Sequence, residues 1–255
     1  MHMRKLLSLA AVVAAIAGHS AVASAAVPRP LESLVSLGAA KIIKTFRAPA
    51  GLQGYLVAQG GQYEVLYGLR GYLLVGGLIS PSGQNETGVL YNKYAPKPDY
   101  KKVADSLAHD RYIVRDGHNG PRIYVFEDPN CIFCHKLFVA LAPFIREGKL
   151  TVDWVPVGFL KPDSAGKAAA ILEAHDRLAK FDQDENRFDS ATEEGGISPA
   201  KPTSAVAQAL DTHLREMQTL HANGTPTLLY QVKTGQWASS IGMPPDIAAL
   251  ISHLR

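Results

Sequence analysis

The sequence predicts a mixed α+β and α/β protein built from two folded units. Short β-like runs separated by glycines fill the first third of the chain, and a segment with two prolines, residues 95–99, interrupts them. A β-like run followed by an amphipathic helical pattern then opens a second stretch, in which helices and strands alternate. We place the two units at residues 27–94 and 110–255, with a linker at residues 95–109.

Residues 1–25 have the features of a secretory signal peptide. A basic start precedes an apolar run from Leu6 to Ile16, and small residues at 23–25 have the A-x-A form of a cleavage site. The apolar run is too short to span a membrane. The mature protein is therefore expected in a bacterial periplasm, where disulfides persist.

Charge and residue spacing exclude several classes of partner. Removing the signal peptide takes two of the 26 basic residues and none of the 23 acidic ones, which leaves a net charge of +1. A near-neutral chain is not expected to bind nucleic acid. The two cysteines form a single CxxC pair, and no histidines have HxxH or HxxxH spacing, so we predict no zinc site and no other resident cofactor.

The first unit is predicted to be a small helix followed by an antiparallel sheet. The helix is expected at residues 31–40. About 65 residues make only a thin core, so covering a sheet edge with a second copy of the chain would stabilise the unit, which predicts a homodimer. The β-like runs lie at residues 42–46, 54–58, 63–67, 72–79 and 89–94.

The linker contains a polar helix at residues 99–109. Val103 and Leu107 are its only clear apolar positions, a pattern typical of a helix that lies outside the core. In the second unit, the acidic segment 181–201 is predicted to be a solvated surface insert.

The order of elements in the second unit predicts its fold. A parallel start, an antiparallel finish and helices on both faces make the thioredoxin arrangement, here with a helical insertion. The expected strands are at residues 123–126, 150–157, 228–232 and 237–241, and the expected helices follow Asn130 and cover residues 164–178, 204–221 and 244–254.

The motif Cys131-Ile132-Phe133-Cys134 is where we predict the chemistry. Asn130 is the expected N-cap of the helix, so the unpaired N–H groups and the dipole at its start favour the thiolate of Cys131. Cys134 lies one turn deeper and is the expected resolving thiol. A disulfide between them would be a poor structural staple, because so short a loop removes little entropy from the unfolded chain.

Two further roles stay open for this region. Cys131, Cys134 and His135 form a candidate thiolate site for copper. His135 is also a candidate for tuning the thiolate, and an exposed helix histidine without such a role is the alternative.

Four segments resemble a known family: VFEDPNCIFCHKL, GKLTVDWVPVGFLKPDSAGKAAAIL and ANGTPTLLY in the second unit and IIKTFRAPAGLQGYL in the first. They are similar to the periplasmic disulfide isomerases and reductases that include DsbC and DsbG, with the DsbG branch more similar. The resemblance covers essentially the whole mature chain. It implies a V-shaped homodimer joined through cystatin-like N-terminal dimerisation domains, and active-site cysteines kept reduced by a membrane electron carrier resembling DsbD.

The resemblance also implies roles for individual residues. Cys131 matches the family's nucleophile and Cys134 its resolving cysteine. Pro226 matches a cis-proline that faces the CxxC motif, and Thr225 precedes it, where an extended substrate segment would pair with the backbone. Ile132 and Phe133 depart from the family pattern of Pro or Gly followed by Tyr, and these positions shape the redox potential.

The sequence therefore predicts a thiol-disulfide oxidoreductase that acts on unfolded or oxidised exported proteins, cysteine sulfenic acids included. The direction of net electron flow stays open, so a net dithiol oxidase is one alternative. A non-catalytic periplasmic chaperone or copper-binding module is the other.

Overall fold

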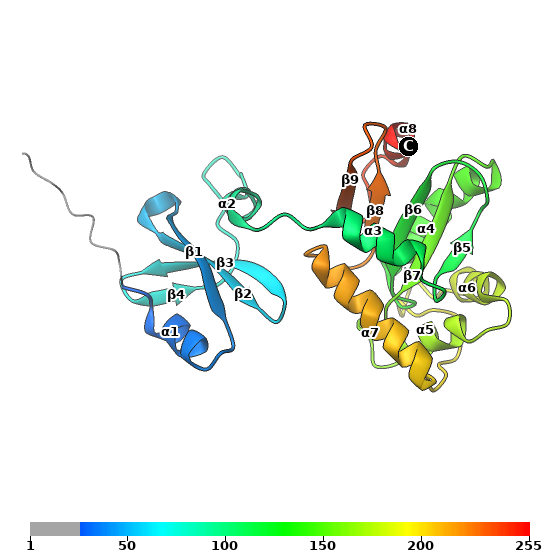
Figure 1. Cartoon of the computed structure of the whole chain (residues 1–255), viewed down its shortest axis with the longest axis horizontal. Helices are drawn as coiled ribbons and strands as arrows, with labels where there is room; N and C mark the ends of the chain where they lie inside the picture. Colours follow the sequence, from blue (N-terminus) through cyan, green and yellow to red (C-terminus); the bar gives the residue numbers. More distant parts are fainter. Residues whose placement is uncertain (1–25) are drawn as a thin grey trace, which may run out of the picture.

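The computed structural model describes residues 26–255, and its strands form two sheets. The predicted signal peptide at residues 1–25 lies outside the described residues. Figure 1 shows the two sheets apart from each other, with an extended segment between helices α2 and α3 joining them. Among the described residues, no helix combines the length and the apolar character needed to cross a membrane.

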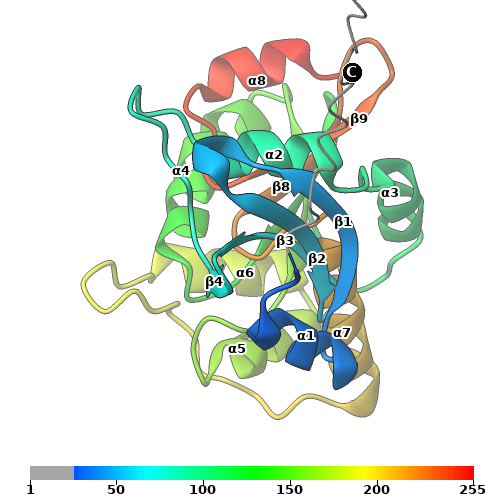
Figure 2. The same ribbon diagram turned by 90° about the vertical axis from the view of Figure 1, so that its left-hand side faces the viewer.

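The first sheet is an antiparallel meander with the strand order β1–β2–β3–β4 (Figure 2). Leu31 of the first helix and Tyr55 of the second strand are fully buried in a shared apolar cluster. The predicted helix with an antiparallel sheet is confirmed. The elements are α1 (Arg29–Ser36), β1 (Lys41–Arg47), η1 (Pro49–Gly51), β2 (Gln53–Gln59), β3 (Gln62–Leu69) and β4 (Tyr72–Leu74).

The strand predicted at residues 89–94 is wrong, because this segment lies in helix α2 (Glu86–Tyr94). The side chain of Asn85 caps the helix by accepting a hydrogen bond from the N–H of Gly88 at 2.9 Å. Leu90 is then buried in the core of the first unit. Apolar and aromatic residues occur in strands and in amphipathic helices alike, and here the cap favours the helix.

The strand predicted at residues 72–79 is much shorter than expected. It ends at Leu74, and Gly76 has a φ of 133°, a conformation that only glycine adopts readily. As a result β4 is a short edge strand. Its last residue, Leu74, and the next residue, Val75, are 42% and 68% exposed.

The second sheet has the strand order β5–β7–β6–β8–β9. β6 runs parallel to β7, and the other three strands run antiparallel to their neighbours, so a βαβ start is followed by a ββα finish. This is the thioredoxin fold. The edge strand β5 was not predicted. The strands are β5 (Val114–Asp116), β6 (Arg122–Glu127), β7 (Thr151–Pro156), β8 (Thr227–Gln231) and β9 (Trp237–Ile241).

Helices cover both faces of this sheet (Figure 1). Side chains along β6 alternate between the faces, with Ile123 and Val125 in the cluster that contains the inner residues of α4. Tyr124 and Phe126 belong to the cluster on the opposite face. The helices are α3 (Tyr100–Ala108), α4 (Ile132–Arg146), α5 (Ser164–Leu172), α6 (Arg177–Asn186), α7 (Ser204–Thr219) and α8 (Ile247–His253).

Helix α3 is a core element of this unit, contrary to the prediction that it lies outside the core. Val103, Ala104 and Leu107 are at most 3% exposed. They pack in one cluster with Tyr124 and Phe126 of β6. The apolar face of α3 is narrow, and large aromatic side chains on the sheet are sufficient to bury it.

The single helix predicted at residues 164–178 is also wrong. The chain forms α5 and then starts a new helix, α6, at Arg177. The side chain of Asp176 accepts a hydrogen bond from the N–H of Ala179 at 2.9 Å and so caps the second helix.

The start of the acidic segment, residues 181–185 within α6, is packed inward. Phe181 is fully buried, and its ring centroid lies 5.0 Å from that of Trp154. Asp184 and Glu185, which follow at i+3 and i+4, are 0% and 2% exposed. The prediction of a solvated insert is therefore wrong for residues 181–185, where acidic residues share a helix face with a buried aromatic ring, and it is confirmed for residues 189–194, which are all exposed.

Candidate active site

Cys131 itself caps helix α4. Its sulfur accepts a hydrogen bond from the backbone N–H of Cys134 at 3.2 Å. The prediction of Asn130 as the N-cap is wrong by one residue, because the side chain of Asn130 is bound elsewhere. The sulfur of Cys131 thus lies at the positive end of the helix dipole, where a thiolate is favoured.

The side chain of Asn130 hydrogen-bonds the turn before Cys131 to the start of α5 and to the loop after α6. Its Nδ2 donates hydrogen bonds of 2.9 Å to Asp163 Oδ1 and to Ser164 Oγ. Its Oδ1 accepts from Lys167 Nζ at 2.8 Å and from the N–H of Gly195 at 3.1 Å. The position of Cys131 therefore depends on α5 and on the loop after α6.

The loop before β8 brings Thr225 and Pro226 to the cysteines. The peptide bond between these two residues is cis. The thiol of Cys131 lies 3.4 Å from the carbonyl oxygen of Thr225, as a donor. The structure thus gathers Cys131, Cys134, Thr225 and Pro226 in one place.

The two thiols differ in acidity. A hydrogen bond from the Cys134 side chain is the main reason that the pKa of Cys131 falls to about 7, with burial acting in the opposite direction. Burial raises the pKa of Cys134 well above its usual value, and the hydrogen bond to Cys131 raises it further. Cys131 therefore forms its thiolate more readily than an ordinary cysteine near neutral pH, while Cys134 keeps its proton.

Ile132 and Phe133, two of the predicted tuning residues, form the start of α4. Phe133 is 53% exposed, and the ammonium group of Lys136 lies 5.2 Å from its ring centroid. Ile132 is half-buried. The residue directly before Cys134 therefore presents an apolar ring to solvent.

His135, the third predicted tuning residue, is not the exposed histidine of the alternative. Its Nδ1 lies 2.9 Å from Glu185 Oε2, and its ring stacks on Phe188 with centroids 4.7 Å apart. The hydrogen bond to Glu185 raises the pKa of His135. Within the described part of the chain, no three His, Cys, Asp or Glu side chains gather in a way that could hold a metal ion.

Besides the hydrogen-bonded Asp128, three further buried carboxyl groups near this region were not predicted. Glu127, Asp184 and Glu185 are at most 2% exposed, and neither oxygen of Glu127 has a hydrogen-bond partner among the described residues. Burial raises the pKa of Glu127 well above its usual value and that of Asp184 to about 7. The helical spacing of Phe181, Asp184 and Glu185 was the signal in the sequence, because it places two acids beside an aromatic residue on one face.

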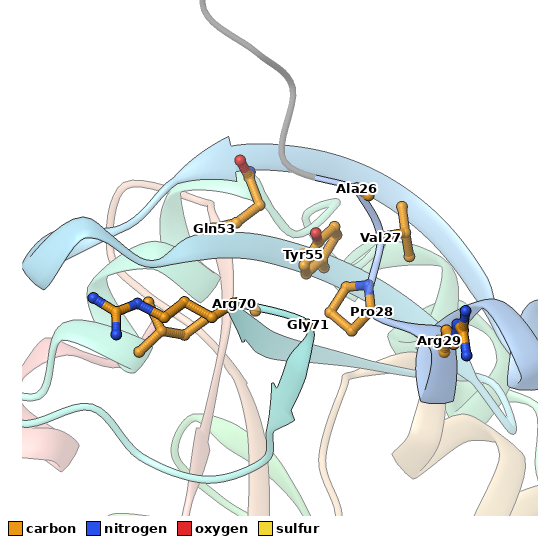
Figure 3. A pocket seen from close by; sticks show the side chains of 10 residues that line it. Ala26, Val27, Pro28, Arg29, Gln53, Tyr55, Arg70 and Gly71 are labelled. Atoms are coloured by element: carbon orange, nitrogen blue, oxygen red, sulfur yellow. The ribbon is translucent and has the colours of Figure 1, made fainter.

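A pocket of about 420 Å³ in the first unit contains none of the predicted site residues (Figure 3). Gln53, Tyr55 and Arg70 are among the side chains that line it. The predicted chemistry lies in the second unit, outside this pocket.

Comparison with known proteins points to one group. The chain is 28% identical over 226 residues to the thiol:disulfide interchange protein DsbG of Escherichia coli (strain K12), a match that covers 85% of this chain and 87% of that protein. It is 27% identical over 253 residues to DsbG of Pseudomonas aeruginosa, with 97% of each chain covered. The chain is therefore similar to the DsbG proteins. This similarity to DsbG spans both sheets and confirms the resemblance found in the sequence.

Two other comparisons add less. No family model matches the sequence. The solved structure of Helicobacter pylori DsbG is 14% identical, covers 78% of this chain and 98% of its own, and has a TM-score of 0.38. The fold assignment therefore rests on the strand order of the chain itself.

Proposed function

We propose that the chain is a periplasmic thiol:disulfide interchange enzyme in which Cys131 attacks and Cys134 resolves. The observation that carries this proposal is the setting of Cys131, whose sulfur caps α4, faces the carbonyl of Thr225 and has a pKa lowered to about 7. The similarity to two proteins named thiol:disulfide interchange protein supports it.

The first chemical step forms a mixed disulfide. The Cys131 thiolate attacks one sulfur of a substrate disulfide, that S–S bond breaks, and the second substrate sulfur leaves as a thiolate. With a cysteine sulfenic acid, the same attack gives the same mixed disulfide and releases hydroxide.

Two outcomes follow from the mixed disulfide. If a substrate thiolate attacks it, the substrate is rearranged and the enzyme dithiol is restored, which is isomerisation. If Cys134 attacks the sulfur of Cys131, the reduced substrate leaves and the Cys131–Cys134 disulfide carries the two-electron oxidation.

Single-cysteine variants test this assignment. Cys131→Ser should abolish disulfide exchange with a scrambled disulfide protein, while Cys134→Ser should accumulate a mixed disulfide visible on non-reducing gels. Exchange that persists in Cys131→Ser would reject Cys131 as the nucleophile. Retained binding of unfolded chains by the same variant would show that a chaperone activity is separate from the thiol chemistry.

We propose net reduction or isomerisation as the direction, with a membrane reductant resembling DsbD as the electron donor. The lowered pKa of Cys131 stabilises the reduced pair and so makes the oxidised pair a better oxidant, which is why a net oxidase is the second candidate. Alkylation of thiols in intact cells separates the two. A mostly reduced pair supports our proposal, and a mostly oxidised pair assigns the oxidase.

We also propose that the first unit joins two copies of the chain. β4 is an edge strand, and Leu69, Tyr72, Leu74 and Val75 around it are all exposed. Covering this apolar edge with a second copy would remove it from water. Replacing Leu74 and Val75 by Asp should convert a dimer to a monomer in sedimentation, and an unchanged dimer would place the interface elsewhere.

A further inference from the structure

Helix α7 ends in a turn that glycine usually supplies, and this chain has His221 there. The N–H of Ala222 donates to the carbonyl oxygen of Met217 at 3.1 Å, and that of His221 donates to the carbonyl oxygen of Gln218 at 2.8 Å. These two bonds make a Schellman motif, in which the residue after the C-cap takes the left-handed conformation. His221 accordingly has a φ of 58°.

The left-handed conformation is unfavourable for a residue with a Cβ, because the Cβ crowds the following carbonyl oxygen. Glycine is the usual residue at this place because it avoids the crowding. Strain of this kind is retained where surrounding contacts hold it, and it is often found at functional sites. The imidazole of His221 therefore has a role that the turn itself does not explain.

The imidazole of His221 packs against the first unit. Its ring centroid lies 4.9 Å from that of Tyr63 on β3, with 66° between the planes, and 6.3 Å from that of Tyr91 on α2, with 88°. Both are edge-to-face arrangements, which aromatic rings prefer. Gln62, next to Tyr63, donates from Nε2 to the carbonyl oxygen of Gln218 at 3.4 Å. In Figure 1 the end of α7 is directed toward the first sheet, in agreement with these contacts.

An open space lies beside this contact. A pocket of about 620 Å³ has Tyr91 and His221 in its lining, together with Lys97 of the linker and Ser239 of β9. The two units are therefore held together at this place by a few side chains, with room for movement around them.

The contact suits a neutral imidazole. Burial lowers the pKa of His221, which favours the uncharged ring. Around it the structure places the phenols of Tyr63, Tyr91 and Tyr100 and the ammonium group of Lys97. These groups offer a neutral ring aromatic contacts and offer an imidazolium no counter-charge. The protonation of His221 therefore reports whether the two units are in contact.

The loop that begins at His221 leads to the candidate active site. Ala222 is fully buried in one cluster with Met217, so the start of the loop is fixed to α7. Thr225 follows three residues after Ala222, and its carbonyl oxygen lies 3.4 Å from the sulfur of Cys131. A side chain that the first unit contacts thus lies at the start of the loop that faces this sulfur.

We propose that the first unit positions the loop that carries Thr225 and Pro226, through the contact of Tyr63 and Tyr91 with His221. His221 is a positioning residue, because it acts on the backbone with which an extended substrate segment pairs. The inference rests on the proposed function, since it concerns how that substrate segment is held.

The kinetic test compares two substrates. A peptide disulfide-linked to cysteamine uses the backbone around Thr225, whereas hydroxyethyl disulfide needs only the sulfur of Cys131. Tyr63→Ala should raise KM for the peptide roughly 2- to 10-fold, the usual effect of losing an aromatic contact, and should leave the rate with hydroxyethyl disulfide unchanged. Glu64→Ala removes the next side chain of β3, which is exposed, and should leave both values at those of the parent.

His221→Gly separates positioning from folding. Glycine takes the left-handed turn without strain, so the free energy of unfolding measured with urea should be kept. The contact with Tyr63 and Tyr91 is lost, so KM for the peptide should rise as it does in Tyr63→Ala. A parent-like KM would reject the positioning role. If His221→Gly unfolds more readily, Tyr63→Ala decides, because it leaves α7 unchanged.

NMR of the His221 imidazole tests the contact itself. Its titration midpoint in the parent should lie below about 6.5, the value of an ordinary histidine, because burial lowers its pKa. Tyr63→Ala should raise the midpoint, since the ring returns to water, and Glu64→Ala should not. A midpoint that stays in place in Tyr63→Ala would show that the two rings do not meet in solution and would overturn the inference.

Two further readouts keep the inference separate from dimer formation and from the proposed function. Tyr63→Ala should sediment as the parent does, and a change of oligomeric state would assign the rise in KM to the dimer interface and overturn the inference. If the parent does not react with hydroxyethyl disulfide, the proposed function fails. If it reacts, and KM for the peptide is the same in all variants, only the positioning role is rejected.

Discussion

The sulfur of Cys131 lies 3.4 Å from the carbonyl oxygen of Thr225, a residue 94 positions further along the chain. The turn after β6 supplies one group, and the loop before β8 supplies the other. Because β6 and β8 are neighbours in the sheet, both segments are held at the same end of it. We therefore expect a substrate that reaches the sulfur to meet the backbone around Thr225 as well.

The acidity of Cys131 should depend on Cys134. Alkylation of Cys131 by iodoacetamide is expected to show an inflection near pH 7 in the parent, the pKa to which Cys131 is lowered. Cys134→Ala removes the largest cause of this lowering, so the inflection should move up toward about 8.5, the value of an ordinary thiol. An unmoved inflection would instead assign the effect to the helix N-terminus.

Asn130→Ala should destabilise the fold. It removes four side-chain hydrogen bonds and takes one partner from the buried ammonium of Lys167. We expect a loss of about 3 kcal/mol in the free energy of unfolding, measured with urea. Asn92→Ala, at an exposed site on α2, is the control and should stay within about 0.5 kcal/mol of the parent.

Phe181→Ala tests whether α6 belongs to the core. Its ring packs against Trp154, so truncation should cost about 3–5 kcal/mol. Phe133→Ala removes a ring of the same size that is 53% exposed and should cost far less. Equal stabilities for the two variants would contradict the packing of α6.

Gly195→Ala should disturb the turn before Cys131. An added Cβ would lie 2.4 Å from the carbonyl oxygen of Pro129 and 2.5 Å from Asp184 Oδ1. We expect a loss of about 1–3 kcal/mol in stability together with slower disulfide exchange. Gly77→Ala meets no atom within 4 Å and should preserve both properties.

Stability should fall as pH rises through the titration of the His135–Glu185 pair. The pKa of His135 is raised by its hydrogen bond to Glu185, and burial raises that of Glu185. Both groups bind protons more tightly in the folded state. The contribution of Glu185 is therefore complete below about 4.3, the unfolded pKa of glutamate, and that of His135 below about 6.5, the unfolded pKa of histidine, and each is lost as pH rises through the raised pKa of the folded state. Urea unfolding at several pH values should show this slope, and His135→Asn should flatten it.

The candidate CxxC motif could be found from the sequence because its proposed chemistry depends on local spacing. Two cysteines after a buried strand and before a helix place one sulfur at the helix start, whatever the rest of the fold does. Hydrophobic runs placed four of the five strands of the second sheet in the same way, and the edge strand β5 was not predicted. The contact between Cys131 and Thr225 came only from the resemblance, since spacing alone does not bring distant loops together.

The errors at helix starts have a common physical origin. Asn85, Asn130 and Asp176 each precede a helix and could each cap it. Tertiary contacts decide whether each side chain does so. The side chain of Asn130 is hydrogen-bonded to the residue before α5 and to the loop after α6, so Cys131 takes the N-cap position of α4. Asp184 and Glu185 were predicted to be solvated because charged side chains favour water. They are buried because Phe181, on the same face of α6, packs into the core.

The burial of α3 also defines where the second unit can be separated from the first. A fragment that starts at residue 110 would lack Val103 and Leu107 and leave Tyr124 and Phe126 uncovered at the back of the central strand. Such a piece is expected to aggregate when expressed by itself. One that begins at Asp99, whose side chain accepts from the N–H of Lys102, keeps the helix with its own cap and should stay in solution.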